Sequence, residues 1–306
     1  PALGVDGLRY LIAQADFTTD IVAGKTVISH IADSLKKFRL TFRFLLGNLN
    51  EGLFELIPLN ELRPVDRYTI FKLQELLDST KKHYDECNFS KVLTAIQYHM
   101  TNELSAFYFD LSKDCLYSDA KSSFKRQQIQ TTLFHIYDAY RAIMMPILPI
   151  LVQESWEYLP KQYLGDYEKS FTPFNRAWPS YEIPMEAHVL FQDELILLKE
   201  FQKQFKELAG KVQKPSQTVT IISTDAPTLP FVAEELKDIL QTGKVSLCTH
   251  SSIEMTSESL KLTDGSKIRV SVQESDLNKC PRCWNYSSEI EDHLCCRCEE
   301  VTKKTM

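Results

Sequence analysis

Apolar side chains recur at steps of three and four residues through the first half of the chain, which is the spacing of an amphipathic helix. Similar series lie within residues 66–84, 92–107 and 124–140. The clearest series precedes them and consists of Ile31, Leu35, Phe38, Phe42, Leu45 and Leu49. At least four long amphipathic helices joined by short connections predict a helical bundle.

Polar residues and helix breakers indicate where these helices begin. Residues 50–64 contain a glycine and two prolines and predict a loop. Asp66 is predicted to be the N-cap of the helix that follows, because a carboxylate there can accept a hydrogen bond from an exposed backbone N–H. Asn88 or Ser90 is predicted to cap the next helix on the same argument.

The pattern changes in the second half of the chain. Residues 158–184 are rich in tyrosine and proline and predict a segment without regular structure that covers the bundle. A charged amphipathic helix is expected over residues 186–209. Beyond it we expect strands at 218–222, 245–248 and 267–272 and a short helix at 233–240. A small α/β unit therefore fits residues 186–275, and the chain as a whole is predicted to be mainly α.

Composition excludes several classes of protein. With 43% apolar, 11% aromatic and 25% charged residues the chain is typical of folded proteins rather than disordered or collagen-like ones. The longest apolar run, residues 142–152, is broken by two prolines and is about half the ~20 residues that a membrane span needs, so we expect no membrane partner. None of the 9 glycines forms a phosphate-binding loop of the GxGxxG or GxxxxGK[ST] kind.

One segment is basic although the chain carries a formal charge of −6. Residues 25–50 contain five basic residues and a single acid, a local charge of +4. Lys36, Arg39 and Arg43 share one helix face, away from the apolar stripe. That face is either a solvated surface or a set of phosphate contacts for a nucleic acid, and Arg43, between two phenylalanines, is alternatively a packed and paired arginine.

The most specific chemistry is a double CxxC arrangement near the C-terminus. Cys280 and Cys283 form one pair and Cys295 and Cys298 the second, within a chain of 8 cysteines. Four thiolates at this spacing predict a closed, tetrahedral Zn²⁺ site that is structural, in a reducing compartment. Two disulfides or a redox-active pair are the alternatives, and Cys296 could exchange with a neighbouring ligand.

Three further residues of this segment are candidates for RNA contacts. Trp284 follows the first CxxC pair and is either a hydrophobic lid over the metal site or a platform on which a base stacks. Arg282 and Arg297 lie inside the two CxxC turns and are either solvated charges or phosphate contacts.

Several blocks together resemble the C-terminal half of the isoleucyl-tRNA synthetases. The blocks are GVDGLRYLIA (4–13), LKKFRLTFRFLLGNL (35–49), NELSAFYFDLSKDCLY (102–117), MPILPILVQESWEYLP (145–160) and the terminal CPRCW and CCRC. The resemblance is collinear over nearly the whole chain. The bundle blocks are similar to the class Ia anticodon-binding domain in general, and the terminal cysteines to the bacterial and mitochondrial type of isoleucyl enzyme.

This resemblance implies a function. The bundle is expected to grip the anticodon arm of tRNA(Ile), with Lys36, Arg39, Arg43, Arg282, Trp284 and Arg297 as tRNA-binding candidates. None of the 7 histidines lies in an HIGH-like motif, and a KMSKS-like motif is absent from the chain, so no catalytic residue is expected here. ATP and Mg²⁺ would belong to a catalytic core outside this chain, and the chain alone is expected to be inactive as a ligase.

The resemblance also implies an organisation and a location. We expect a link to the catalytic core at residues 1–20, an anticodon-binding domain at 21–185, an α/β junction domain at 186–275 and a zinc finger at 276–306. A monomer that binds no DNA is expected. The sequences of the loops depart from the usual bacterial form, which favours the mitochondrial matrix over the bacterial cytoplasm.

Two alternatives come from other functional classes. A zinc-finger DNA glycosylase also ends in four cysteines and uses an N-terminal proline, but here Ala2 follows Pro1 and helices begin almost at once. The second alternative is a helical scaffold with a structural zinc finger and no role in RNA binding. A measurement of binding to tRNA distinguishes this scaffold hypothesis from the synthetase hypothesis.

Overall fold

The computed structural model describes residues 3–15, 20, 23–49, 55–164, 172–182, 189, 191–225, 229, 232–249 and 257–303. Its contacts divide the chain into two compact units. The first unit is Pro1–Asp110 with Lys121–Ala187, and the second is Leu111–Ala120 with His188–Met306. The predicted domain boundaries at residues 20, 185 and 275 stay a prediction.

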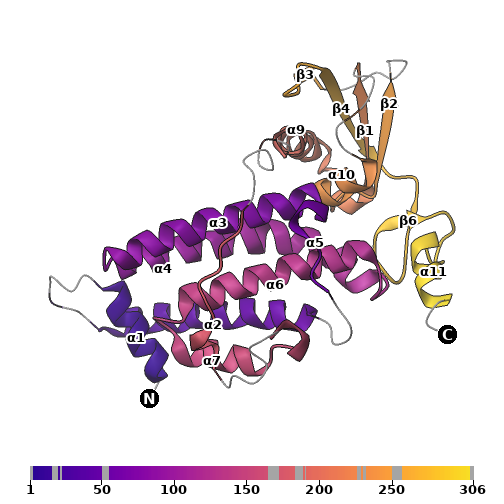
Figure 1. Ribbon diagram of the computed structural model, residues 1–306. Coiled ribbons are helices and arrows are strands. Elements are labelled where there is room, and N and C mark those ends of the chain that lie inside the picture. The colour runs from indigo at the N-terminus through magenta and orange to yellow at the C-terminus, as the bar shows by residue number, and fades with distance from the viewer. Residues whose placement is uncertain are drawn as a thin grey trace. The chain divides into compact units, whose positions relative to one another are not determined.

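The first unit is a helical bundle, as predicted. Figure 1 shows its long helices α2, α3, α4 and α6 side by side, and pairs among them are in contact. The helices of this unit are α1 (Gly4–Gln14), α2 (Lys25–Asn48), α3 (Pro64–Asp85), α4 (Phe89–Tyr98), the π-helical η2 (His99–Tyr108), α6 (Phe124–Met144) and α7 (Pro149–Glu157). Short 3₁₀ turns are η1 (Leu59–Glu61), η3 (Lys161–Tyr163) and η5 (Pro173–Asn175). Across the described ranges, no helix has both the length and the apolar character that crossing a membrane requires.

The apolar stripe of α2 faces the core. Ile31, Phe38, Phe42 and Leu45 are each at most 2% exposed, which confirms the predicted helix face. Helix α6 is buried along most of its length and supplies tyrosines and aliphatic residues to the same core. The stripe read from the sequence therefore packs on the most buried helix of the unit.

The predicted N-cap role of Asp66 is wrong. Helix α3 begins at Pro64, which is suited to the first helical position because its φ is fixed and it has no N–H to satisfy. Asp66 thus lies inside the first turn and is completely buried. Both its carboxylate oxygens accept hydrogen bonds from Arg63 at 2.8 Å, and the Tyr108 hydroxyl donates a third at 2.7 Å. Asn88 does occupy the N-cap position of α4, although its side chain makes no capping hydrogen bond.

The second unit contains a small α/β sheet. Strands β1 (Thr218–Thr224), β2 (Lys244–Thr249), β3 (Leu260–Lys261) and β4 (Lys267–Glu274) lie in the order β2-β1-β4-β3. Strand β1 pairs in parallel with β2 and antiparallel with β4. Helices α9 (Gln192–Leu208) and α10 (Ala233–Leu240) pack on the sheet with Leu197, Phe201 and Leu236. The three predicted strands and the two helices are confirmed, and the predicted start of the first helix at 186 lies outside the described residues.

The same unit includes α5 (Phe109–Ser118) and a terminal cysteine-rich hairpin. Helix α5 continues the α4–η2 helix, but from Leu111 onward it clusters with the second unit. The hairpin consists of β5 (Asn278–Lys279) and β6 (Tyr286–Ser288), followed by α11 (Cys296–Lys303). The second unit is therefore built from segments far apart in the sequence.

Two histidines, the buried His99 and the partly buried His135, make the stability of the bundle depend on pH. Burial lowers the pKa of His99 and of His135 to about 4, against about 6.5 in an unfolded chain. Between pH 6.5 and 4 the unfolded chain binds more protons, so the free energy of unfolding is expected to fall as pH falls, by about 3 kcal/mol at most for each histidine. Urea denaturation of wild type and His135→Phe across this window checks the expectation. The variant should show a shallower decline, and an identical decline would contradict a titrating His135.

Candidate metal centre and basic helix face

The four predicted cysteines converge at one point of the hairpin. Cys280 follows β5, Cys283 lies in the turn, and Cys295 and Cys298 flank the start of α11. The four sulfur atoms lie within 4.8 Å of one another, and three of the four residues are at most 5% exposed. Cys296 is exposed and is not part of this cluster. None of the eight cysteines forms a disulfide in the structure.

Local dipoles and burial act on these thiols in opposite directions. Burial raises the pKa of Cys280, but backbone N–H groups of Cys283, Cys295 and Arg282 outweigh it and lower the pKa to about 6. Burial dominates at the other affected thiols, raising the pKa of Cys283 and raising that of Cys298 to about 12. As a donor set, four sulfurs with no open position match a structural zinc site.

Trp284 lies on the surface of the hairpin. Its side chain is 67% exposed, and its backbone φ of 65° is unusual for a residue other than glycine. The indole Nε1 donates to the carbonyl of Pro281 at 3.1 Å, and the Lys279 ammonium lies 5.0 Å from the ring centroid. A ring this exposed covers little of the cysteine cluster, so the arrangement favours an open platform over a lid.

Arg282 and Arg297 are engaged by helix α5. Arg297 donates to both carboxylate oxygens of Asp114, at 2.6 and 3.0 Å, and pairs with Asp119 at 3.3 Å. Arg282 donates to the carbonyl of Ser118 at 2.6 Å and to the sulfur of Cys298 at 3.4 Å. Burial lowers the pKa of Arg297, but its hydrogen bonds to Asp114 outweigh this and raise it. Both arginines therefore hold the hairpin on α5. Their role as phosphate contacts stays a prediction.

The acids of α5 are the site residues that sequence reasoning missed. Asp114 also accepts a hydrogen bond from the Asn285 side chain at 2.8 Å, which ties the hairpin turn to the same carboxylate. Asp114 lies in the family block at 102–117, so a signal was present. The pairing of Asp114 with Arg297, 183 positions later, could not be predicted, because spacing along the chain says nothing about such a distant contact.

The basic face of α2 belongs to the first unit. Lys36, Arg39 and Arg43 are all exposed, so the alternative that Arg43 is a packed arginine is wrong. Arg39 pairs with Glu154 at 2.6 Å, with both side chains largely exposed. An ion pair so open to water contributes little and leaves the charge free to exchange partners.

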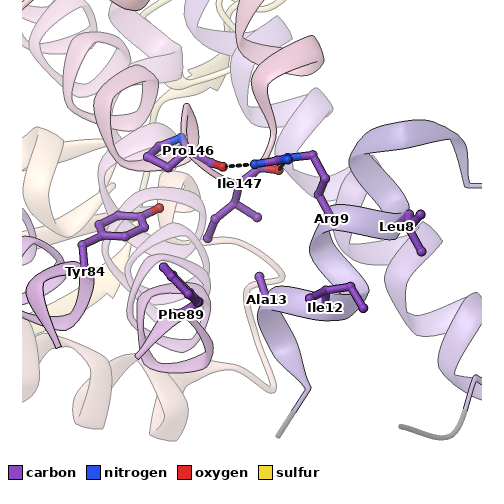
Figure 2. A pocket seen from close by; sticks show the side chains of 8 residues that line it. All are labelled: Leu8, Arg9, Ile12, Ala13, Tyr84, Phe89, Pro146 and Ile147. Atoms are coloured by element: carbon purple, nitrogen blue, oxygen red, sulfur yellow. Dashed lines mark hydrogen bonds between the residues drawn. The ribbon is translucent and has the colours of Figure 1, made fainter. Parts of the chain in front are cut away.

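A separate apolar pocket of about 340 Å³ lies against α1 in the first unit. Figure 2 shows the side chains that line it, with Tyr84 and Phe89 on one side and Leu8, Ile12 and Ala13 of α1 on the other. Arg9 donates to the carbonyls of Pro146 and Ile147 in its wall. Nothing in the sequence pattern predicted this pocket, because α1 alone does not reveal which helix faces it.

The described residues thus form a helical bundle, a small α/β sheet and a hairpin with four clustered cysteines. A family model described as the anticodon-binding domain of tRNA ligase matches residues 66–222, and the chain belongs to this family. The DNA glycosylase alternative finds no support in this match.

Related sequences align with this chain over nearly its whole length. The mitochondrial isoleucine–tRNA ligase of Saccharomyces cerevisiae is 48% identical over 100% of this chain and 31% of its own length. The mitochondrial isoleucine–tRNA ligase of Schizosaccharomyces pombe is 32% identical over 97% of this chain and 32% of its own length. The isoleucine–tRNA ligase of Thermotoga petrophila is 31% identical over 98% of this chain and 33% of its own length. The chain thus spans about a third of the length of the relatives it matches.

Proposed function

We propose that this chain is the tRNA-binding part of an isoleucine–tRNA ligase and that it grips the anticodon arm of tRNA(Ile). The family match over residues 66–222 carries the proposal, and the names of the relatives supply the amino acid. Ligase activity with ATP and Mg²⁺ is assigned to the remainder of such an enzyme. The relative from Saccharomyces cerevisiae is a mitochondrial enzyme, whereas the relative from Thermotoga petrophila is bacterial. The higher identity of this chain to the mitochondrial enzyme favours the mitochondrial matrix.

The four-cysteine cluster is proposed to hold one structural Zn²⁺. Cys280, Cys283, Cys295 and Cys298 supply four sulfurs, which fits a closed tetrahedral site at about 2.3 Å per ligand. The metal would supply the folding free energy of a hairpin that has little apolar core of its own.

The tRNA-binding candidates are proposed to have different roles in RNA binding. Lys36 and Arg43 present exposed charge on α2 and are proposed as phosphate contacts, with Arg39 joining them once it leaves Glu154. Trp284, with Lys279 over its ring, is proposed as a stacking platform for an unpaired base. Arg282 and Arg297 position that platform by holding the hairpin on α5.

The double variant Lys36→Gln/Arg43→Gln is expected to weaken binding to any tRNA and to flatten its salt dependence. Each phosphate contact removed should reduce the slope of log K against log salt by roughly 0.7 to 0.9, because fewer counterions are released on binding. Trp284→Ala should instead weaken binding by about 5- to 150-fold with the slope unchanged, because stacking carries no charge. Filter binding of tRNA(Ile) and of its isolated anticodon stem-loop at several salt concentrations measures both.

Lys37→Gln is the matched control, since Lys37 is exposed on the same helix beside the proposed face. It should leave the slope close to that of wild type. If wild type binds neither RNA, the helical-scaffold alternative replaces this proposal. Equal slopes for the control and the double variant would remove Lys36 and Arg43 from the interface.

A further inference from the structure

Two sequence blocks that have no part in the function proposed above meet in the first unit. The blocks are GVDGLRYLIA (4–13), which forms most of helix α1, and MPILPILVQESWEYLP (145–160), which contains the turn after α6 and helix α7. Asp6 and Arg9 are three positions apart and therefore lie on one side of α1. Both side chains bind backbone groups of residues 146–151.

Asp6 caps helix α7 from another helix. Its carboxylate accepts hydrogen bonds from the backbone N–H groups of Ile150 at 3.2 Å and Leu151 at 2.7 Å. Helix α7 begins at Pro149, and its N-cap residue, Leu148, has no side-chain oxygen that could accept them. The first N–H groups of a helix have no partner within it, and the helix dipole favours a carboxylate at this end. A residue far away in the sequence therefore supplies the cap that the local sequence lacks.

Arg9 binds the turn that precedes α7. Its guanidinium donates to the carbonyls of Pro146 at 2.5 Å and Ile147 at 3.1 Å (Figure 2). Helix α6 ends at Met144, so these carbonyls lie beyond its last turn, where intrahelical donors are lacking. A charged donor makes such hydrogen bonds stronger than those between neutral groups. Asp6 and Arg9 together form a clamp that fixes α1 against the turn between α6 and α7.

A second side of α1 packs on the bundle. Tyr10 is 1% exposed, and its ring centroid lies 6.4 Å from that of Phe38 in α2. The Tyr10 hydroxyl also accepts a hydrogen bond from the side chain of Gln97 in α4. Helix α1 is therefore held on two sides, by apolar packing and by the clamp.

A third side of α1 is apolar and open. Val5, Leu8 and Ile12 follow the i, i+3, i+7 spacing of one helix face and are 60%, 59% and 50% exposed. Leu8 and Ile12 also line the apolar pocket against α1, so this surface continues into a hollow. Exposed apolar side chains that are grouped in this way mark an interaction site.

The partner that this face fits is the rest of the ligase. The chain spans about a third of the length of the relatives it matches, so a ligase of that size has most of its chain outside this bundle. The anionic backbone of an RNA is bound by charged and polar groups. Three aliphatic side chains therefore favour a protein partner over the tRNA itself.

We propose that α1 docks through Val5, Leu8 and Ile12 on the catalytic part of the ligase, and that Asp6 and Arg9 are positioning residues that fix the direction of this helix on the bundle. The clamp thereby sets where a tRNA held by the bundle meets the catalytic part. This inference rests on the proposed function, because it needs a ligase that binds tRNA through this chain.

Hydrogen exchange of this chain tests the clamp. Asp6→Ala should increase exchange at the amides of Ile150 and Leu151, because it removes their acceptor. Asp6→Asn should keep most of the protection, since an asparagine oxygen also caps a helix. Asp78→Ala, which removes an exposed acid of α3, should exchange as wild type does. Equal exchange in Asp6→Ala and Asp78→Ala would overturn the inference.

Kinetics of the full-length ligase that contains this chain test the positioning role. Asp6→Ala and Arg9→Met should lower kcat for aminoacylation of tRNA(Ile) by about 10- to 100-fold, because a displacement of about 1 Å that arises far from the reacting atoms can be this costly. Asp6→Asn should rescue it. Isoleucine-dependent pyrophosphate exchange, which needs no tRNA, should stay at the wild-type rate, and binding of tRNA(Ile) to this chain should be unchanged. A merely structural defect would lower exchange and aminoacylation together.

The double variant Leu8→Ser/Ile12→Ser tests the docking face. It keeps the clamp and should lower aminoacylation by the ligase to a similar extent, because α1 loses its apolar contact. Sedimentation of this chain tests a second copy as the alternative partner. A dimer that the double variant converts to a monomer would assign the face to self-association and overturn docking on the catalytic part.

The outcomes separate this inference from the proposed function. The inference is overturned if Asp6→Ala and Arg9→Met aminoacylate tRNA(Ile) as Asp78→Ala does, or if pyrophosphate exchange falls in step with aminoacylation. Binding of tRNA(Ile) to the chain in either case leaves the proposed function standing. A wild-type chain that binds no tRNA contradicts the proposed function, and this inference with it, whatever the variants do.

Discussion

Cys280→Ser is expected to abolish retention of one zinc per chain and to unfold the terminal hairpin. Cys280 is a fully buried member of the cluster, and a serine hydroxyl is a poor replacement for a thiolate ligand. Structural zinc in small finger peptides binds with about 10–16 kcal/mol of apparent free energy, and in a site of this kind binding energy is folding energy. Metal analysis after exhaustive dialysis should return about one equivalent for wild type and none for the variant.

Loss of the hairpin should also be visible away from the cysteines. Arg297 and Asn285 hold Asp114 of α5 only while the hairpin is folded, so hydrogen exchange in α5 is expected to rise in Cys280→Ser or after chelation. Cys296→Ser is the control, because this exposed cysteine has no place in the cluster and its variant should keep the metal. A Cys296→Ser protein that loses zinc while Cys298→Ser retains it would show that the ligand assignment is wrong.

Asp66→Ala is expected to lower the free energy of unfolding of the bundle by about 3–5 kcal/mol. The substitution leaves the guanidinium of Arg63, which is 8% exposed, without its bidentate partner, and it removes the acceptor of the Tyr108 hydroxyl. A buried charge that loses its partner carries most of its desolvation cost into the folded state. Urea denaturation followed by circular dichroism measures the difference.

Asp78→Ala on the same helix provides the comparison. Asp78 is exposed and accepts a hydrogen bond from Gln74, so its replacement is expected to change stability by no more than about 0.5 kcal/mol. The double replacement of Arg63 and Asp66 by leucine should cost less than Asp66→Ala, because no unpaired charge remains. If Asp66→Ala and Asp78→Ala unfold at the same urea concentration, the ion pair does not stabilise the bundle.

Local sequence pattern was sufficient to predict the long helices, three strands and the cysteine cluster. The stripe from Ile31 to Leu49 predicted α2 because a helix places every third or fourth residue on one face. The strands at 218–224 and 267–274 were predicted to within two residues, since β-branched and alternating runs satisfy a sheet locally. Cys280, Cys283, Cys295 and Cys298 were found from spacing, because a CxxC turn brings its two sulfurs together whatever surrounds it.

Contacts between distant segments were decided only by the tertiary structure. Asp66 was predicted to be an N-cap because the sequence around it fits one, but helix α3 begins two residues earlier, at Pro64. The buried carboxylate of Asp66 instead accepts a hydrogen bond from Tyr108 of η2. Arg297 was predicted to be either a solvated charge or a phosphate contact, because an arginine in an exposed turn usually faces water. Its ion pair with Asp114 was not predicted. Charge and hydrogen-bond partners depend on distances through space, and those distances follow from how the helices pack. The sequence by itself therefore determined the long helices, three of the strands and the four-cysteine cluster, whereas packing decided which polar side chains are paired.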